Sequence, residues 1–300
     1  MFPCLFSEII FIIVAGNELE LTQLSAAKQQ EDDVFNVYIL PSQPISQHIV
    51  DLTGLSVQRQ NGERVLTHNG VVVESVSAKQ ALEQFCDWLP RRSVLFAHNG
   101  KAFDIPHLIR VSNENGVQLS QKVVCMGDTL PVTKEVFPEE RSYSQETLCK
   151  QLLDLTYKAH DSSEDACALK KLAEHTITSS KDANLLLKHC FTFSSCAADA
   201  RYKTQQNDNF KTLIGLVSGK IISKSMGQKI AGSGLQYGHL KCAYERSGID
   251  GLTALFKSKT EKGPRVTNMQ RIILSVSDHF EGASRKDASE TETGNSNTLE

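Results

Sequence analysis

Two carboxylates and a histidine in this sequence have the types and spacing that suit metal-assisted phosphodiester hydrolysis. His160 and Asp165 form a His-x4-Asp pair, and Asp104 follows the apolar run 93–97. Hard divalent cations prefer anionic oxygen ligands, and two such ions about 4 Å apart stabilise the attacking and the leaving oxygen. An imidazole, with an unperturbed pKa of about 6.5, suits the deprotonation of a water molecule. These three residues are therefore candidates for a hydrolytic site.

The segments around the three residues predict an α/β domain that brings them to one edge of a sheet. Alternating or continuous apolar residues predict strands at 9–15, 21–27, 34–40, 93–97 and 123–126, the first three forming an antiparallel meander. Helical spacing and caps predict helices at 77–89, 103–111, 144–153 and 161–174, whereas 44–57 is expected to be loop with a short helix. The order β-β-β-α-β-α-β-α-α indicates a mixed five-stranded sheet flanked by helices.

The chain is long enough for two domains. The α/β pattern covers about residues 8–176, and strand signals fade after residue 180. Residues 181–281 have helical periodicity interrupted by glycines and serines, which predicts a small helical domain. Residues 283–300 are polar without an apolar anchor, and we expect them to form a disordered tail.

Several motifs, in order, resemble those of the DEDDh (DnaQ-like) 3′–5′ exonucleases of the ribonuclease H-like superfamily. The second motif of that family, His-Asn-x-x-Phe-Asp, is similar to the segment from His98 to Asp104, although three residues here separate Asn99 from Phe103. His160–Asp165 is similar to the third motif. Thr53-Gly54, Asp128-Thr129 and the segment 143–148 also lie where the family carries related residues. The resemblance covers about residues 8–176, and it extends to the exonuclease-like region of fish proteins related to the promyelocytic leukaemia protein.

This resemblance implies a role for each candidate residue. Asp104 and Asp165 would be ligands of Mg²⁺ or Mn²⁺, and His160 would be the general base. Asn99 and Phe103 would contact the substrate, the 3′ end of single-stranded DNA or RNA. The implied reaction is hydrolysis of the terminal phosphodiester.

This sequence departs from the family at the first motif. Family members carry Asp-x-Glu-Thr on the first strand, but residues 9–14 read Ile-Ile-Phe-Ile-Ile-Val. Glu8 lies too early, and Glu18 and Glu20 belong to the following turn and strand. Two of four expected acids are missing, and Asp104 and Asp165 alone give each ion about one carboxylate, too few for tight binding.

Two functions of different classes therefore remain open. One is a metal-dependent exonuclease whose first motif is restored by an alternative start or exon. The other is a non-catalytic module that retains the fold and binds nucleic acid or a protein partner. For the chain as written we favour weak or absent activity.

The distribution of charge indicates possible partners, and the distribution of cysteines indicates the cellular compartment. Residues 201–271 hold 13 Lys+Arg and 4 Asp+Glu, a formal charge of +9 in a chain whose total is −3. Such a module suits a polyanionic partner, or it is only a solvated basic face. The eight cysteines include no CxxC pair, which indicates a reducing compartment, nuclear or cytoplasmic. The apolar run 9–15 is too short to span a bilayer, so we expect a buried strand and no membrane association.

Overall fold

The computed structural model describes residues 7–16, 20–261 and 263–294, with side chains described as far as residue 282. The chain divides into two compact units, Met1–Ala200 and Arg201–Glu300. In the first unit the main sheet has the strand order β10-β9-β8-β1-β2-β3-β7 among the described residues. These strands are β1 (Ile9–Gly16), β2 (Leu21–Lys28), β3 (Val34–Ile39), β7 (Ser75–Val76), β8 (Ser93–Ala97), β9 (Val123–Asp128) and β10 (Cys190–Thr192).

Strand β1 lies at the centre of this mixed sheet. It pairs antiparallel with β2 and parallel with β8, and β8 pairs parallel with β9. Because both faces of β1 are covered, its sequence is continuously apolar instead of alternating. The predicted α/β fold with a mixed sheet is confirmed, and all five predicted strands are present. The sheet is wider than predicted because β7 and β10, of two and three residues, are too short to give a sequence pattern.

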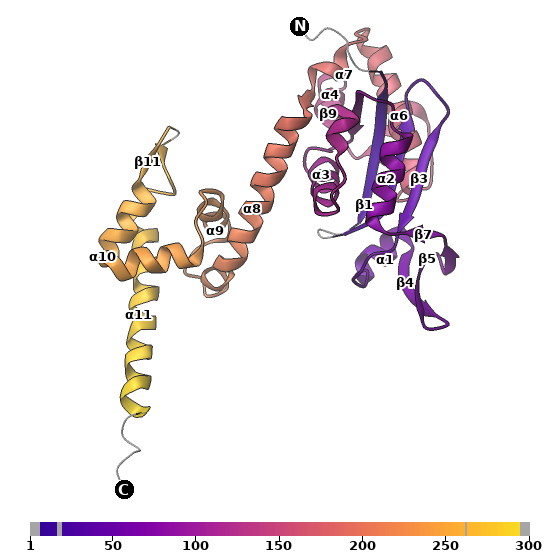
Figure 1. The fold of residues 1–300 in the computed structure, drawn as a ribbon. Helices are drawn as coiled ribbons and strands as arrows, with labels where there is room; N and C mark the ends of the chain where they lie inside the picture. The colour runs from indigo at the N-terminus through magenta and orange to yellow at the C-terminus, as the bar shows by residue number, and fades with distance from the viewer. Residues whose placement is uncertain (1–6, 17–19, 262, 295–300) are drawn as a thin grey trace. The chain divides into compact units, whose positions relative to one another are not determined.

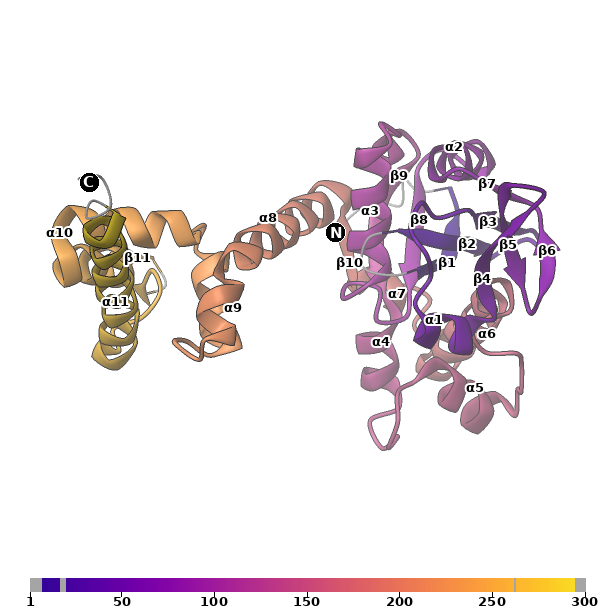
Figure 2. The same ribbon diagram turned by 90° about the horizontal axis from the view of Figure 1, so that it is seen from below.

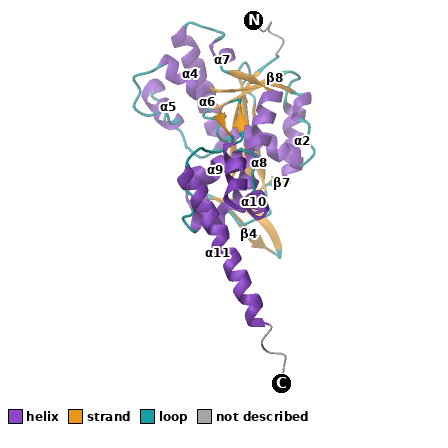
Figure 3. Cartoon of the chain, turned by 90° about the vertical axis from the view of Figure 1, so that its left-hand side faces the viewer, coloured by secondary structure: helices purple, strands orange, loops and turns teal. Residues whose placement is uncertain are grey.

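Helices cover both faces of the sheet, whose strands are orange between purple helices in Figure 3. One face packs on α2 (Ala78–Trp88), α3 (Asp104–Glu114) and the start of α8 (Phe193–Ser218), through a core that includes Ile12, Phe85 and Leu108. The other face packs on α4 (Thr129–Val136), α6 (Ser162–Ser180) and α7 (Leu185–Lys188). Helix α5 (Gln145–Leu153) packs on α6. The alternation of side chains along β1 sends Ile12 and Val14 to the α3 side.

A small second sheet lies in a region for which we predicted no strands. After α1 (Gln47–Thr53), the strands β4 (Leu55–Gln60), β5 (Glu63–His68) and β6 (Val71–Val73) form an antiparallel meander, visible in Figure 2. Its turns are the pairs Asn61-Gly62 and Asn69-Gly70, with positive φ at all four residues. This is the backbone of two-residue hairpin turns, for which Asn-Gly is the preferred sequence.

The second unit is helical and has its own core. It contains the residues of α8 from Arg201 onward, α9 (Lys224–Gly232), α10 (Tyr237–Lys257), the hairpin of β11 (Lys259–Thr260) and β12 (Gly263–Pro264), and α11 (Gln270–Gly294) (Figure 1). Non-helical backbone at Ser247 and Gly248 divides α10 into two segments. Buried residues such as Leu213, Ile230 and Phe256 form one cluster.

The limits that we predicted for the domains stay predictions. The structure divides the chain at residue 200, within α8, and helix α11 continues to Gly294. Of the tail that we expected to be disordered, residues 295–300 lie outside the described residues. None of the described helices combines the length and the apolar content that crossing a bilayer requires.

Candidate functional site

The parallel strands bring the candidate carboxylates to one end of the sheet. Strands β1, β8 and β9 run in the same direction, with Ala97 of β8 opposite Asp128 of β9. Asp104 follows β8 after a short loop and begins α3, and Asp128 ends β9 and caps α4. Loops that follow parallel strands meet at the carboxyl edge of the sheet. Three carboxyl groups, those of Asp104, Asp128 and Asp165, interact electrostatically there, and we call them the acidic pocket.

Asp104 is deeply buried, with 8% of its surface exposed. Its Oδ1 accepts a hydrogen bond of 2.9 Å from the backbone N–H of Val14 on β1. Burial raises the pKa of Asp104 to about 7, because an ionised carboxylate loses its hydration there. The Val14 hydrogen bond opposes this rise, and the negative charges of Asp128 and Asp165 add to it.

Asp165 lies in the first turn of α6 and is half-buried. Its Oδ2 accepts a hydrogen bond of 3.1 Å from the backbone N–H of His160, and the hydroxyl of Tyr157 also hydrogen-bonds to the carboxylate. Burial raises the pKa of Asp165, against the opposing effects of Tyr157 and His160. Gln145 completes the network, since its Nε2 donates to the Tyr157 hydroxyl at 3.1 Å and to the Asp165 carbonyl at 2.8 Å.

His160 lies beside Asp165, as the His-x4-Asp spacing predicts. Its side chain is exposed, and its backbone adopts a left-handed φ of 71° on the loop before α6. The contact with the Asp165 carboxylate is made by the backbone N–H of His160, while the charge of His160 lowers the pKa of Asp165 from nearby. The role of the imidazole as a base stays a prediction.

The loop between β8 and α3 presents the two predicted substrate contacts. Asn99 is exposed, with a left-handed φ of 58°, and Phe103 is 39% exposed. The ring of Phe103 stacks on His107, with 4.9 Å between the ring centroids. Gly100 is required inside this loop, because a Cβ there would lie 2.5 Å from the Cβ of Ala97. An accessible amide and an accessible ring thus lie on the loop that leads into Asp104.

Asp128 and His98 hold that loop in place. Asp128 Oδ2 accepts from the backbone N–H of Lys101 at 3.1 Å, and its Oδ1 accepts from that of Leu130 at 2.9 Å. His98 Nε2 donates to the carbonyl of Tyr143 at 2.7 Å, which leaves Nδ1 to accept from the Thr129 hydroxyl at 2.9 Å. Burial lowers the pKa of His98 and keeps the ring neutral.

The sequence reasoning missed Tyr157, and it gave His98 no role beyond its place at the start of the second motif. The position of Tyr157 three residues before His160 is the signal that was available. His98 carries no comparable sequence signal, because its partners Thr129 and Tyr143 are distant in the chain.

No described acid occupies the place expected for the first motif. Val14 is the residue of β1 that contacts Asp104, and Ile12 shares its face; the two are 3% and 0% exposed. The Glu8 carboxylate accepts from the backbone of Gln30, and that of Glu20 accepts from Ser42 and Gln43. Glu18 lies outside the described residues.

The acidic pocket does not fit a pair of metal ions. Each of its three carboxylates already accepts hydrogen bonds from the protein, and the adjoining face of β1 is apolar. Among the described residues, His, Cys, Asp and Glu side chains form no group of three or more that could hold an ion. The fourfold carboxylate set that two hard cations require is therefore incomplete in this part of the chain.

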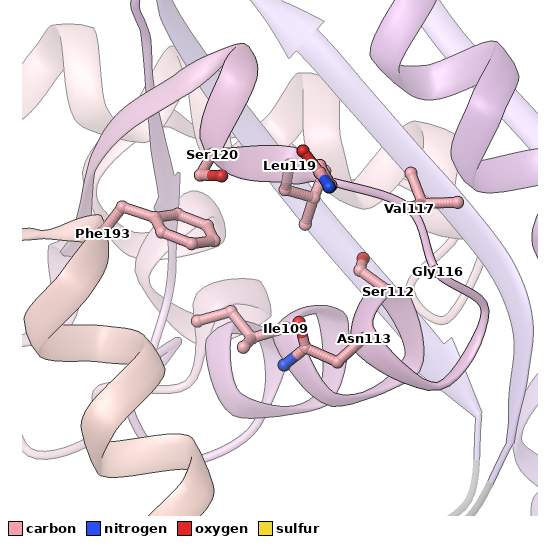
Figure 4. A pocket seen from close by; sticks show the side chains of 9 residues that line it. Ile109, Ser112, Asn113, Gly116, Val117, Leu119, Ser120 and Phe193 are labelled. Carbon is pink, nitrogen blue, oxygen red and sulfur yellow. The ribbon is translucent and has the colours of Figure 1, made fainter.

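A cavity of about 180 Å³ lies at the other end of α3 from Asp104 (Figure 4). Its walls come from the last turns of α3, from the loop and short helix that precede β9, and from Phe193 at the start of α8. It contains none of the predicted site residues.

Comparison with known proteins relates each unit to a family. A family model described as Exonuclease matches residues 6–173, and one described as PML, C-terminal domain, matches residues 209–283. The PolC-type DNA polymerase III of Bacillus cereus is 24% identical over 139 residues, which are 46% of this chain and 9% of that protein. The PolC-type enzyme of Streptococcus mutans is 26% identical over 157 residues, 51% of this chain and 10% of that protein. The chain thus spans about a tenth of the length of these relatives.

Solved structures with a related arrangement are distant. E. coli exonuclease I in complex with a dT13 oligonucleotide has a TM-score of 0.49 and 16% identity, over 58% of this chain and 42% of that chain. The nuclease domain of 3′hExo, a DEDDh family member bound to rAMP, has a TM-score of 0.45 and 15% identity, over 59% of this chain and 94% of that chain.

Proposed function

This chain belongs to the exonuclease family, whose model matches more than half of it, and we propose that it binds the 3′ end of single-stranded DNA or RNA with little or no hydrolysis. In this proposal the first unit retains the DnaQ-like, ribonuclease H-like fold as a binding module. The polymerase activity of the PolC-type relatives is not carried over, because the match covers only a tenth of those proteins.

One observation carries the proposal: the β1 residue beside the Asp104 carboxylate is Val14, and it contributes a backbone N–H. A metal-binding site would place a carboxylate at this position, and Ile12 and Val14 fill it with buried apolar side chains instead. The N–H of Val14 donates a hydrogen bond to Asp104 Oδ1, which partly compensates the buried carboxylate for its lost hydration. With burial raising its pKa to about 7, Asp104 carries a proton for much of the time at neutral pH.

The loop before α3 supports the binding part of the proposal. Phe103 presents an exposed ring backed by His107, and a nucleobase can stack on such a ring regardless of its identity. Asn99, also exposed, offers an amide that can both donate and accept hydrogen bonds. His98 and Asp128 hold the loop through the hydrogen bonds described above, so that little flexibility needs to be lost on binding.

A second candidate function is metal-dependent 3′–5′ hydrolysis with Mg²⁺ or Mn²⁺. It is supported by the electrostatic interaction of Asp104 with Asp165, which are acids of two separate motifs. In this candidate Asp104 and Asp165 are metal ligands, and His160 is the general base. A nuclear or cytoplasmic location stays a prediction in either case.

Incubation of the full chain with a 5′-labelled single-stranded oligonucleotide separates the candidates. We expect retention of the labelled strand on a native gel and no shortening in Mg²⁺ or Mn²⁺. Shortening that depends on Mn²⁺ and disappears in Asp165→Asn would overturn the non-catalytic proposal in favour of the enzyme. If neither a DNA nor an RNA oligonucleotide is retained or shortened, both candidate functions are refuted. Binding of a protein partner would then be the remaining function.

A further inference from the structure

Helices α9 and α10 of the second unit are joined as a helix-turn-helix. Helix α9 has nine residues, and α10 begins at Tyr237 after a turn formed by residues 233–236. Gly234 in this turn has a left-handed φ of 80°, a conformation that glycine adopts without strain. The first segment of α10 ends at the break at Ser247 and Gly248. Helix-turn-helix proteins use two short helices joined by a tight, often glycine-containing turn to place the second helix in a nucleic-acid groove.

The turn is fixed by packing on its inner side. Ile230 of α9, Leu235 of the turn and Leu240 of α10 are at most 3% exposed and belong to one core cluster. The carbonyl of Ser233 accepts two hydrogen bonds from Arg265, at 3.0 and 3.2 Å. The angle between the two helices is therefore held by the core of the unit.

Helix α8 satisfies the carbonyl groups at the end of α9. The Tyr202 hydroxyl donates to the carbonyl of Gly232 and the Asn209 amide to that of Ala231, both at 3.0 Å. Carbonyls in the last turn of a helix have no partner within the helix and need such donors. With its inner face and its end held in this way, α9 presents one remaining face to solvent.

That face of α9 is polar and basic. Its exposed residues fall within about 140° of the helix circumference and are Lys224, Ser225, Gln228 and Lys229. No carboxylate lies within ion-pair distance of Lys224 or Lys229 in the part of the chain that the structure describes, whereas Lys211 and Lys241 pair with Asp208 and Glu245. Two exposed ammonium groups on one face of a helix, without carboxylate partners, can bind the phosphates of a nucleic-acid backbone.

The first segment of α10 also exposes a polar face, which begins with a glycine. The exposed residues of the segment are Gly238, His239, Lys241, Cys242, Glu245 and Arg246. A Cβ added at Gly238 would meet nothing within 4 Å, so the start of the helix is open to close approach. None of the large, exposed apolar side chains of the described chain lies on α9 or on this segment of α10, which argues against an apolar protein interface.

We propose that this helix-turn-helix binds double-stranded nucleic acid. The open N-terminal face of α10, from Gly238 to Arg246, enters the major groove, and Lys224 and Lys229 of α9 contact the phosphates beside it. The excess of nine positive charges between residues 201 and 271 supplies the long-range attraction. This surface belongs to the second unit and the acidic pocket to the first, so the duplex contact proposed here is additional to the proposed strand-end contact.

Fluorescence anisotropy of the full chain with a labelled blunt duplex, at several salt concentrations, tests this surface. We expect Lys224→Gln with Lys229→Gln to weaken duplex binding about tenfold at physiological salt and to reduce the slope of log K against log[salt] by roughly 2, since each phosphate contact contributes about 0.9. Gly238→Glu, which adds a negative charge in open space, is expected to abolish duplex binding. Thermal melting curves that match those of the unsubstituted protein show that the fold is intact.

The matched control is Lys257→Gln with Lys259→Gln, which removes the same charge from exposed positions beyond the break in α10. This control is expected to change duplex affinity less than twofold. Equal losses in both double variants would show general charge attraction and overturn the assignment to α9. Absence of duplex binding by the unsubstituted chain at low salt would overturn it in favour of a protein partner. Single-strand binding that survives all these substitutions tests the proposed function independently.

Discussion

The backbone N–H of Val14 donates a hydrogen bond to the Asp104 carboxylate across 2.9 Å. This contact joins the central strand β1 to the first residue of α3, at the point where a metal-dependent exonuclease of this family carries acidic side chains. It explains how a buried carboxylate persists beside the apolar residues Ile12 and Val14.

Asp104→Asn is expected to stabilise the protein, and more so as pH rises. In the folded protein the pKa of Asp104 is about 7, above the usual 3.8. The proton on Asp104 therefore contributes fully to the free energy of unfolding below pH 4, and this contribution is lost as pH rises through 7. The gain over the unsubstituted protein is at most on the order of 4 kcal/mol at pH 8 and close to zero at pH 4. Asparagine retains the Oδ1 that accepts from Val14. Urea unfolding at both pH values measures the difference.

A gain that is the same at pH 4 and pH 8 would show that folding does not raise the pKa of Asp104, contrary to the value given above. Added Mn²⁺ serves as the control for metal binding. If it stabilises the unsubstituted protein but not Asp104→Asn, the pocket takes a cation after all.

Ile12→Asp with Val14→Glu is expected to convert the pocket into a metal site. Both side chains are buried on the face of β1 that adjoins Asp104, so without metal the two acids should lower stability by several kcal/mol. Mn²⁺ should restore the melting temperature and confer shortening of a labelled oligonucleotide. The matched variant, Ile12→Asn with Val14→Gln, should be destabilised but insensitive to Mn²⁺. If the acidic pair gains no thermal shift with Mn²⁺, the placement of the side chains at positions 12 and 14 beside Asp104 is wrong.

Phe103→Ala is expected to weaken single-strand binding by about 1–3 kcal/mol, the contribution of one base stacked on an aromatic ring. Some stability should also be lost, because the ring is only 39% exposed and stacks on His107, so melting curves accompany the binding measurement. Val71→Ala, at an exposed site on the small sheet, is the control and should leave affinity unchanged. Filter binding with DNA and RNA strands measures the effect. An unchanged affinity in Phe103→Ala would remove this residue from the binding surface.

His98→Ala is expected to destabilise the first unit by roughly 2–4 kcal/mol at pH 7.5, since two hydrogen bonds and a partly buried ring are lost. Burial lowers the folded pKa of His98 below its usual 6.5, so the unsubstituted protein itself loses stability as pH falls through 6.5, when the unfolded chain takes up the proton. The difference between the two proteins should therefore shrink at pH 5. Chemical unfolding at the two pH values measures it, and a constant difference would contradict a neutral His98.

The sequence by itself determined the strand order along the chain and the residues that gather at the sheet edge. Continuous apolar runs gave β1, β8 and β9, and Ser77 and Pro90 bounded α2 because capping and proline chemistry act over a few residues. The two Asn-Gly turns of the small sheet were equally local signals, but no strands were predicted around them.

Only the tertiary structure decided what the acidic residues touch. The Val14–Asp104 contact spans 90 positions, and His98 meets Tyr143 across 45, so neither leaves a local pattern in the sequence. The spacing predicted that His160 lies beside Asp165. It did not predict that the Asp165 carboxylate is hydrogen-bonded to the backbone N–H of His160 and to the Tyr157 hydroxyl. The physical reason is that a pKa, and with it the fitness of a site for metal, depends on burial and on hydrogen bonds between distant segments, which exist only once the sheet has formed.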